Sequence, residues 1–212
     1  IEDYEKEFPK DSIIGLGDSF MEGYGLNHND TFAFKLQEKI NKKVFNLGSY
    51  HFGPLQYYLI YKDFGGKLPH STVILFFLPS NDFEDNDYKN IKTFGDRYRP
   101  YYKFNEESNE FDVIYPENSI KREYIGRNKL HNFFIAQSLR FNSIRLYKNI
   151  RILRNYKVSS KKLFSFNQDS IIKQKASLNY INKIYELAKV RGVKKFIILS
   201  IPSKNDFKEY EK

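Results

Sequence analysis

The hydrophobic pattern of this chain is a series of short apolar runs, each followed by glycine or by polar turn residues. Apolar runs of four to eight residues between turn signals are typical of buried strands. The clearest run, STVILFFL, is apolar almost throughout and predicts a strand that is buried on both faces of a sheet. The four predicted strands are Ser12–Leu16, Lys43–Leu47, Ser71–Leu78 and Lys194–Ser200.

Helical patterns lie between these strands. Phe32, Leu36 and Ile40 recur at helical spacing after a cap at Asp30 or Thr31. Two further helices are expected, one between Gly53-Pro54 and Gly65-Gly66 and one near Ser170–Val190. The alternation of strands and helices predicts an α/β fold: a three-layer α/β/α sandwich around a mostly parallel sheet.

The length of 212 residues fits a single α/β domain that spans residues 1–212. Its pattern weakens between about 85 and 168, where we expect a polar, Tyr-rich insertion. Ten of the 35 Lys and Arg residues and no acidic residue lie between Tyr124 and Gln168, so the formal charge of +9 belongs to this one segment.

The basic segment also carries apolar residues at helical spacing. Residues 140–162 could therefore contact a membrane surface or an acidic polymer, although a charged helix face is often simply solvated. Nucleic acid is not an expected partner, because no helix-turn-helix, zinc or RNA-binding motif accompanies the charge.

The absence of cysteine excludes disulfides, a thiolate nucleophile and Cys-ligated zinc, and it leaves the cellular compartment open. The chain begins at Ile1 with no methionine and no signal-like segment. This favours a bacterial protein outside the cytoplasm or anchored to a membrane, with a leader or anchor upstream.

Candidate chemistry lies where the first strand ends, at Gly17-Asp18-Ser19. A serine at the carboxyl end of a buried strand lies at the rim of an open α/β sheet, where such folds bind ligands. Gly17 permits a tight turn, and N–H groups at the start of the next helix would face the same space. These are parts of an acyl-transfer site, although a Gly-Asp-Ser turn can also do no more than cap a helix.

Two other strand ends carry comparable turns, Asn46-Leu47-Gly48 leading to Gly53, and Ser80-Asn81-Asp82. Parallel strands bring these turns to the same edge of the sheet as Ser19. Ser19 would then supply a nucleophile, and backbone N–H groups together with the Asn81 amide would supply donors to an oxyanion.

These three blocks, in this order, resemble the SGNH hydrolases, also called the GDSL esterase and lipase superfamily. The resemblance implies the flavodoxin-like SGNH fold and a serine ester hydrolase for carbohydrate or lipid acyl esters, with no cofactor and no metal. It implies that Ser19 is the nucleophile and that Ser19 N–H and Asn81 are oxyanion donors. Where the family has its second-block donor glycine this chain has His51, and Gly53 is the alternative donor. The supporting residues would be Asp18, Asn46, Gly48 and Asp82.

The family's last block, an Asp-x-x-His that supplies the general base and its orienting carboxylate, has no match. None of the four histidines, His28, His51, His70 and His131, has an aspartate three residues before it. A serine hydroxyl without a base is a weak nucleophile, so the 212-residue chain by itself is expected to be inactive. Three explanations stay open: a chain without the C-terminal part of the fold, a non-catalytic relative, and His51 as a substitute base.

Two alternatives to hydrolysis also stay open, a non-catalytic domain that binds acylated glycans or lipids and an O-acyltransferase that gives the acyl group to a sugar. The acidic run Asp82, Glu84, Asp85 and Asp87 does not match a calcium loop, and we interpret it as a solvated loop in which Asp82 helps to hold Asn81. Gly15-Leu16-Gly17 is not a dinucleotide fingerprint, because Phe20 occupies the third glycine position.

Overall fold

The computed structural model describes residues 8–90, 99–115 and 168–202. All of these belong to one of the two units into which the chain divides, Ile1–Pro116 together with Phe166–Lys212. The other unit, Glu117–Ser165, falls within the expected insertion and lies outside the described residues, as does the basic stretch 140–162.

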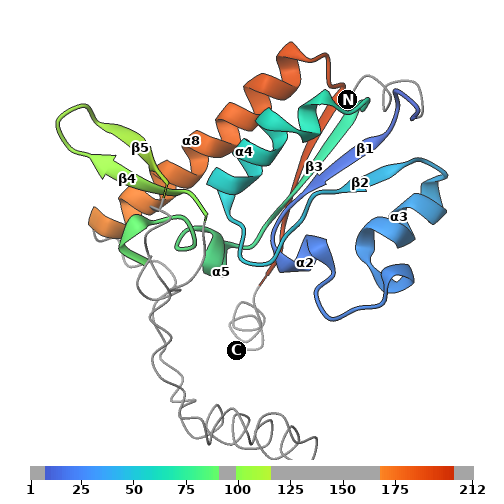
Figure 1. Ribbon diagram of the computed structural model, residues 1–212, viewed down its shortest axis with the longest axis horizontal. Coiled ribbons are helices and arrows are strands. Elements are labelled where there is room, and N and C mark those ends of the chain that lie inside the picture. Colours follow the sequence, from blue (N-terminus) through green and yellow to red (C-terminus); the bar gives the residue numbers. More distant parts are fainter. Residues whose placement is uncertain (1–7, 91–98, 116–167, 203–212) are drawn as a thin grey trace, which may run out of the picture. The chain divides into compact units, whose positions relative to one another are not determined.

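Four parallel strands form the central sheet, in the order β2-β1-β3-β6 (Figure 1). Each strand agrees with its predicted range to within one residue at either end, so the parallel α/β sheet is confirmed. The bounds are β1 (Ile13–Leu16), β2 (Val44–Asn46), β3 (Thr72–Phe77) and β6 (Lys195–Ser200).

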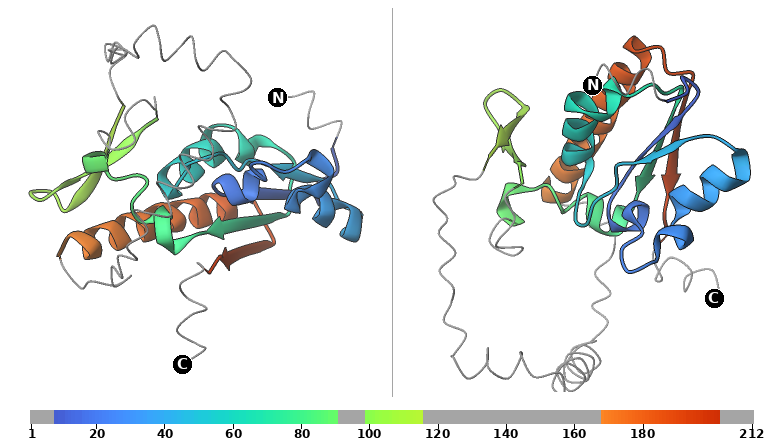
Figure 2. Two further views of the ribbon diagram at one scale, coloured as in Figure 1. Left: turned by 90° about the horizontal axis from the view of Figure 1, so that it is seen from below. Right: turned by 45° about the vertical axis from the view of Figure 1, so that its right-hand side comes forward.

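Helices cover both faces of the sheet (Figures 1 and 2). One face carries α4 (Pro54–Asp63) and α8 (Gln168–Val190), which lie side by side, and the other carries α2 (Ser19–Glu22) and α3 (Phe32–Ile40). The chain moves from β1 to β2 in one direction and from β2 to β3 in the other. Right-handed crossovers then require helices on opposite faces, which produces the expected three layers.

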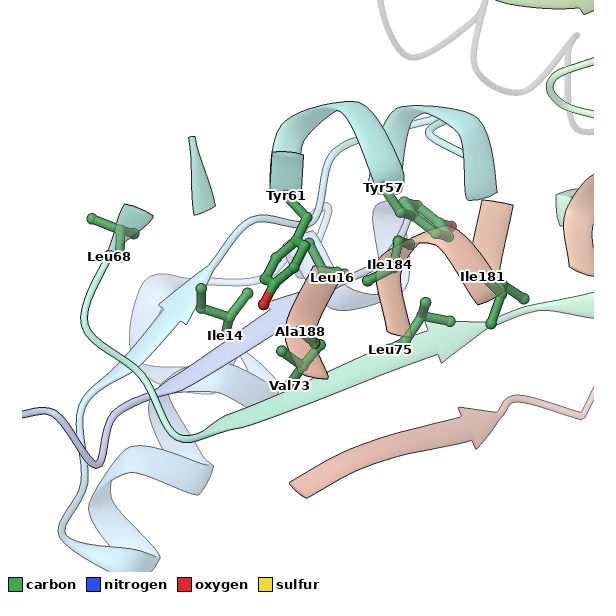
Figure 3. Packing of buried hydrophobic residues seen from close by; sticks show 10 residues of the cluster. All are labelled: Ile14, Leu16, Tyr57, Tyr61, Leu68, Val73, Leu75, Ile181, Ile184 and Ala188. Atoms are coloured by element: carbon green, nitrogen blue, oxygen red, sulfur yellow. The ribbon is translucent and has the colours of Figure 1, made fainter. Parts of the chain in front are cut away.

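Alternate strand residues divide the core between these faces, because successive side chains of a strand point to opposite sides. Figure 3 shows the larger cluster, which packs beneath α4 and α8. Its strand residues are Ile14, Leu16, Val73 and Leu75, and its helix residues include Tyr57, Tyr61, Ile181, Ile184 and Ala188. The cluster on the opposite face contains Ile13, Met21, Ala33, Val44, Ile74 and Phe76.

The buried face of α3 agrees with the prediction at Leu36, which packs against the core, but differs from it at the other two positions. Phe32 and Ile40 are 38% and 37% exposed, whereas Ala33 is buried. The small Ala33 side chain packs in the core cluster on this face of the sheet. There Phe32 meets Phe76 edge to face, with 4.8 Å between the ring centroids.

An antiparallel hairpin of β4 (Tyr101–Asn105) and β5 (Glu110–Ile114) was not predicted from the sequence. Its Tyr102 is buried with Leu55 of α4 and Tyr180 of α8, so this part of the insertion packs against the helices of the main fold.

The remaining short elements are α5 (Pro79–Asp82) and the 3₁₀ turns His28–Asp30, Gly65–Lys67 and Tyr88–Asn90. No described helix combines the length and the apolar character that a membrane span requires.

Candidate active site

The first and third sequence blocks meet at one end of the sheet. Ser19 opens α2 directly after β1, and Asn81 lies in α5 directly after the neighbouring strand β3 (Figure 1). The chain leaves β1 toward β2 on one side and returns to β3 on the other, so this end is the topological switch point where open α/β sheets bind ligands.

Asp18 holds the turn that carries Ser19. It is only 1% exposed, and its Oδ1 accepts a hydrogen bond of 2.9 Å from the Phe20 N–H, which caps α2. Ser19 itself is half-buried, and among the described residues neither its N–H nor its hydroxyl donates a hydrogen bond.

The second block packs directly against α2, and two glycines make this possible. A β-carbon at Gly48 would lie 2.5 Å from the Glu22 backbone nitrogen, and one at Gly17 would lie 2.6 Å from Met21 Cβ. Asn46 fixes the turn, since its Oδ1 accepts from the Gly48 N–H at 3.0 Å and its Nδ2 donates to the Met21 carbonyl at 2.9 Å.

Asn81 joins the turn after β1 to the turn after β3. Its Nδ2 donates to Asp18 Oδ2 at 3.2 Å and to Asp85 Oδ2 at 3.1 Å, so both amide hydrogens are used. If the Asn81 amide were turned by 180°, its oxygen would face the oxygens of two carboxylates and no hydrogen bond could form. The amide therefore has its Nδ2 toward Asp18 and Asp85. To donate to an oxyanion, Asn81 must exchange one of these two bonds.

His51 occupies the second-block position with a left-handed backbone, φ +60°. This conformation costs a residue with a β-carbon roughly 1–2 kcal/mol and suits glycine. The imidazole Nδ1 lies 3.9 Å from Asp85 Oδ1, and the Tyr50 ring meets the imidazole edge to face at 3.8 Å between centroids. The side chain of His51 thus reaches toward the turn after β3, which contains Asn81 and Asp85.

Gly53 has its N–H engaged in capping α4. That N–H donates to Gln56 Oε1 at 3.0 Å. Asn86 Oδ1 accepts from the Leu55 N–H at 2.8 Å, and a β-carbon at Gly53 would lie 2.6 Å from the same oxygen. Of the two donors expected in the second block, Gly53 thus has its N–H engaged within the chain.

The acidic run after β3 is largely buried, so its interpretation as a solvated loop is wrong. Asp82, Asp85 and Asp87 are 1%, 1% and 6% exposed, and only the side chain of Glu84 is about half exposed. The local pattern did not show this burial, because part of the pairing comes from distant segments: Tyr57 donates to Asp82, and Arg99 lies beside Asp85. Within the part of the chain that the structure describes, no three His, Asp or Glu side chains are grouped so as to hold a metal ion.

Asp82 supports the third turn through α4 and not through contact with Asn81. Its Oδ2 accepts from the Leu78 N–H at 2.7 Å and its Oδ1 accepts from the Tyr57 hydroxyl at 3.0 Å. Burial raises the pKa of Asp82 well above its usual value, and the nearby Asp18 carboxylate raises it further. Burial and the Asp82 charge likewise raise the pKa of Tyr57.

Asp85 and Arg99 contact each other beside Asn81, a contact that the sequence reasoning missed. Arg99 is 6% exposed, its Nη2 donates to the Asp85 carbonyl at 2.5 Å, and the same nitrogen lies 3.9 Å from Asp85 Oδ1. The spacing of Asp85, four residues after Asn81, was a signal that could have found it. Arg99 gave no such signal, because it comes from the insertion.

No protein-family model and no curated protein matches this chain. Among solved structures, the chain is similar to AlinE4, an SGNH-hydrolase family esterase, with 22% identity over 31% of this chain and 39% of that one, at a TM-score of 0.28. It is also similar to a protein of Desulfitobacterium hafniense DCB-2 described as lipolytic and of the G-D-S-L family, with 13% identity over 94% of this chain and 66% of that one, at a TM-score of 0.42. The chain therefore spans less than two thirds of either protein.

Parallel substitution of His51 by glycine and by alanine tests its left-handed backbone. Glycine adopts a positive φ without steric cost. Alanine has a β-carbon, which at positive φ lies too close to the carbonyl oxygen that follows it in the backbone. The His51→Gly variant should be more stable than His51→Ala by about 1 kcal/mol, measured by urea denaturation. At Ser49, which has no positive φ, the same pair of substitutions should show the opposite order. A His51→Gly variant less stable than His51→Ala would contradict the described backbone.

Replacement of Asp82 by asparagine should change the pH dependence of stability. Because the pKa of Asp82 is raised on folding, its contribution to the free energy of unfolding is highest below about pH 4 and falls as the pH rises toward the folded pKa. Asparagine stays neutral, so thermal unfolding should show Asp82→Asn gaining stability relative to the parent chain between about pH 4 and pH 7. Asp11, whose pKa is lowered by its hydrogen bond to Lys42, provides a control: Asp11→Asn should lose relative stability as the pH rises through about 4. A pH-independent difference for Asp82→Asn would contradict the raised pKa.

Proposed function

We propose that the intact protein is a serine ester hydrolase for carbohydrate or lipid acyl esters, with Ser19 as its nucleophile. The observation that supports this most is the pair of hydrogen bonds from Asn81 to Asp18 and Asp85. These bonds hold the turn of Ser19 beside the third turn, at the end of the sheet where α/β folds bind ligands.

The proposed reaction is acyl transfer through the serine. The Ser19 hydroxyl gives its proton to a general base while Oγ bonds to the acyl carbon, and the carbonyl oxygen becomes an oxyanion. The N–H groups of Ser19 and His51 and the Asn81 amide stabilise that oxyanion. The intermediate then expels the alcohol, which takes up the proton, and water releases the acid from the acyl-serine.

The proposal requires a general base at Ser19, and His70 does not fit that role. It precedes β3, at the amino end of the sheet, and its ring nitrogens contact the Tyr61 hydroxyl at 2.9 Å and the Leu68 carbonyl at 2.7 Å. Burial also lowers the pKa of His70. Since the Asp-x-x-His of the resembled family has no match in the sequence, the 212-residue chain should bind esters and turn them over poorly.

A second candidate function is ligand binding without hydrolysis. It is favoured by the use of both Asn81 amide hydrogens within the chain, because an oxyanion donor has to be available to the substrate. Binding of an acylated ligand by the intact protein without release of acid would support this candidate over the hydrolase.

Replacement of Ser19 by alanine should abolish ester hydrolysis by the intact protein while its thermal unfolding stays unchanged. The measurement is release of acid from p-nitrophenyl acetate, repeated with an acceptor sugar so that product analysis separates hydrolysis from O-acyl transfer. Ser49→Ala, in the neighbouring turn, is the matched control and should keep its turnover. Unchanged hydrolysis by Ser19→Ala would overturn the proposed function.

Replacement of Asn81 by alanine should lower kcat on the order of 10²- to 10³-fold if the amide donates to the oxyanion. The change also removes the donor shared by Asp18 and Asp85, so some stability should be lost as well, and kcat has to be measured where circular dichroism shows the variant folded. Asn27→Ala, at an exposed asparagine before α3, should change neither quantity. A folded Asn81→Ala variant with unchanged kcat would exclude the amide as a donor.

A further inference from the structure

Large apolar side chains lie exposed in the segments next to Ser19. They are Phe20, Tyr24, Leu26 and Tyr50, with exposed fractions of 56%, 68%, 57% and 46%. Three of them follow the serine within seven residues, and Tyr50 belongs to the second turn. Exposed apolar side chains gathered in this way mark ligand-binding or interaction surfaces.

Two of these side chains form a defined pair. The rings of Tyr24 and Tyr50 stack with 4.8 Å between centroids and 20° between planes. We call this pair the aromatic platform. The backbone ties both segments to the turn of Ser19: the Tyr24 N–H donates to the Ser19 carbonyl at 3.0 Å, and the N–H of Ser49, the residue before Tyr50, donates to the Gly17 carbonyl at 3.1 Å. The platform therefore has a fixed place beside Ser19.

We propose that the aromatic platform binds the sugar ring of an O-acylated carbohydrate and presents its acyl group to Ser19. This inference rests on the proposed ester hydrolase and specifies its substrate. A pyranose ring has an apolar C–H face bordered by hydroxyls, which matches the flat face and the phenolic hydroxyl of tyrosine. Tyrosine also offers this surface at a low cost in conformational entropy.

The exposure of the platform favours a sugar over an acyl chain as its occupant. An alkyl chain gains binding free energy in proportion to the apolar area removed from water, so it binds best in an enclosed groove. The ring of Tyr24 is 68% exposed and presents an open face. A sugar that stacks on such a face keeps its hydroxyls in water and still buries its C–H surface.

The test is binding of acetylated oligosaccharides to the 212-residue chain in a Ser19→Ala background, so that turnover does not consume the ligand. Four probes cover the common backbones: acetylated gluco-, galacto- and xylo-oligosaccharides and an acetylated N-acetylglucosamine oligomer, each titrated by calorimetry. At least one should bind, and Tyr24→Ala and Tyr50→Ala should each weaken it roughly 3- to 10-fold. Tyr24→Phe and Tyr50→Phe keep the ring faces and should retain most of the affinity.

Tyr185→Ala, at a tyrosine of α8 with 45% exposure, is the matched control and should change the affinity less than about twofold. Three results would each overturn the proposal. None of the four probes binds, or the Tyr24 and Tyr50 variants bind them as tightly as the parent chain. In the third, octanoylglycerol alone binds in a way that depends on these tyrosines. The last result would assign the surface to an acyl chain. Hydrolysis that survives Ser19→Ala would instead refute the proposed reaction, whatever the platform binds.

Discussion

Two buried carboxylates share one amide group, and the arrangement of the candidate site depends on it. Asp18 and Asp85 both accept from the side chain of Asn81. The turns after β1 and β3 cannot separate without leaving a buried carboxylate short of a donor, at a cost of about 1–3 kcal/mol or more for each lost partner. The strand pairing brings these turns near each other, and the shared amide sets the position of Ser19 relative to the third turn.

The same interaction explains why the insertion takes part in the site. Three carboxylates, Asp18, Asp82 and Asp85, are buried close together, and unpaired charge of one sign is costly in a protein interior. Asp82 is satisfied locally by α4 and the Leu78 N–H. Asp85 is balanced by Arg99, which comes from the segment that leads into β4. The candidate site is thus built from four segments, not only from the three blocks visible in the sequence.

Most of the fold could be predicted because its signals are local. Buried strands in a parallel sheet are continuous apolar runs, and their carboxyl ends face one way, which brought the turns of Ser19, Asn46 and Asn81 to one edge. What could not be predicted depends on partners far away in the chain. The burial of Asp85 requires Arg99, and the Gly53 N–H is used because Gln56 is oriented by contacts with the insertion. The predicted face of α3 was wrong at Phe32 and Ile40, because 3.6-residue spacing does not show that the small Ala33 side chain faces the sheet.

The start of α4 illustrates what such distant partners imply for the order of folding. The Leu55 N–H donates to Asn86, 31 residues further along the chain. Gln56, which accepts from the Gly53 N–H, in turn donates to the Pro100 carbonyl, 44 residues away. A helix start that relies on these contacts must wait for long loops to close, and closing long loops slows folding. The corner that borders Ser19 therefore completes its hydrogen bonds only once the segments that carry Asn86 and Pro100 have docked.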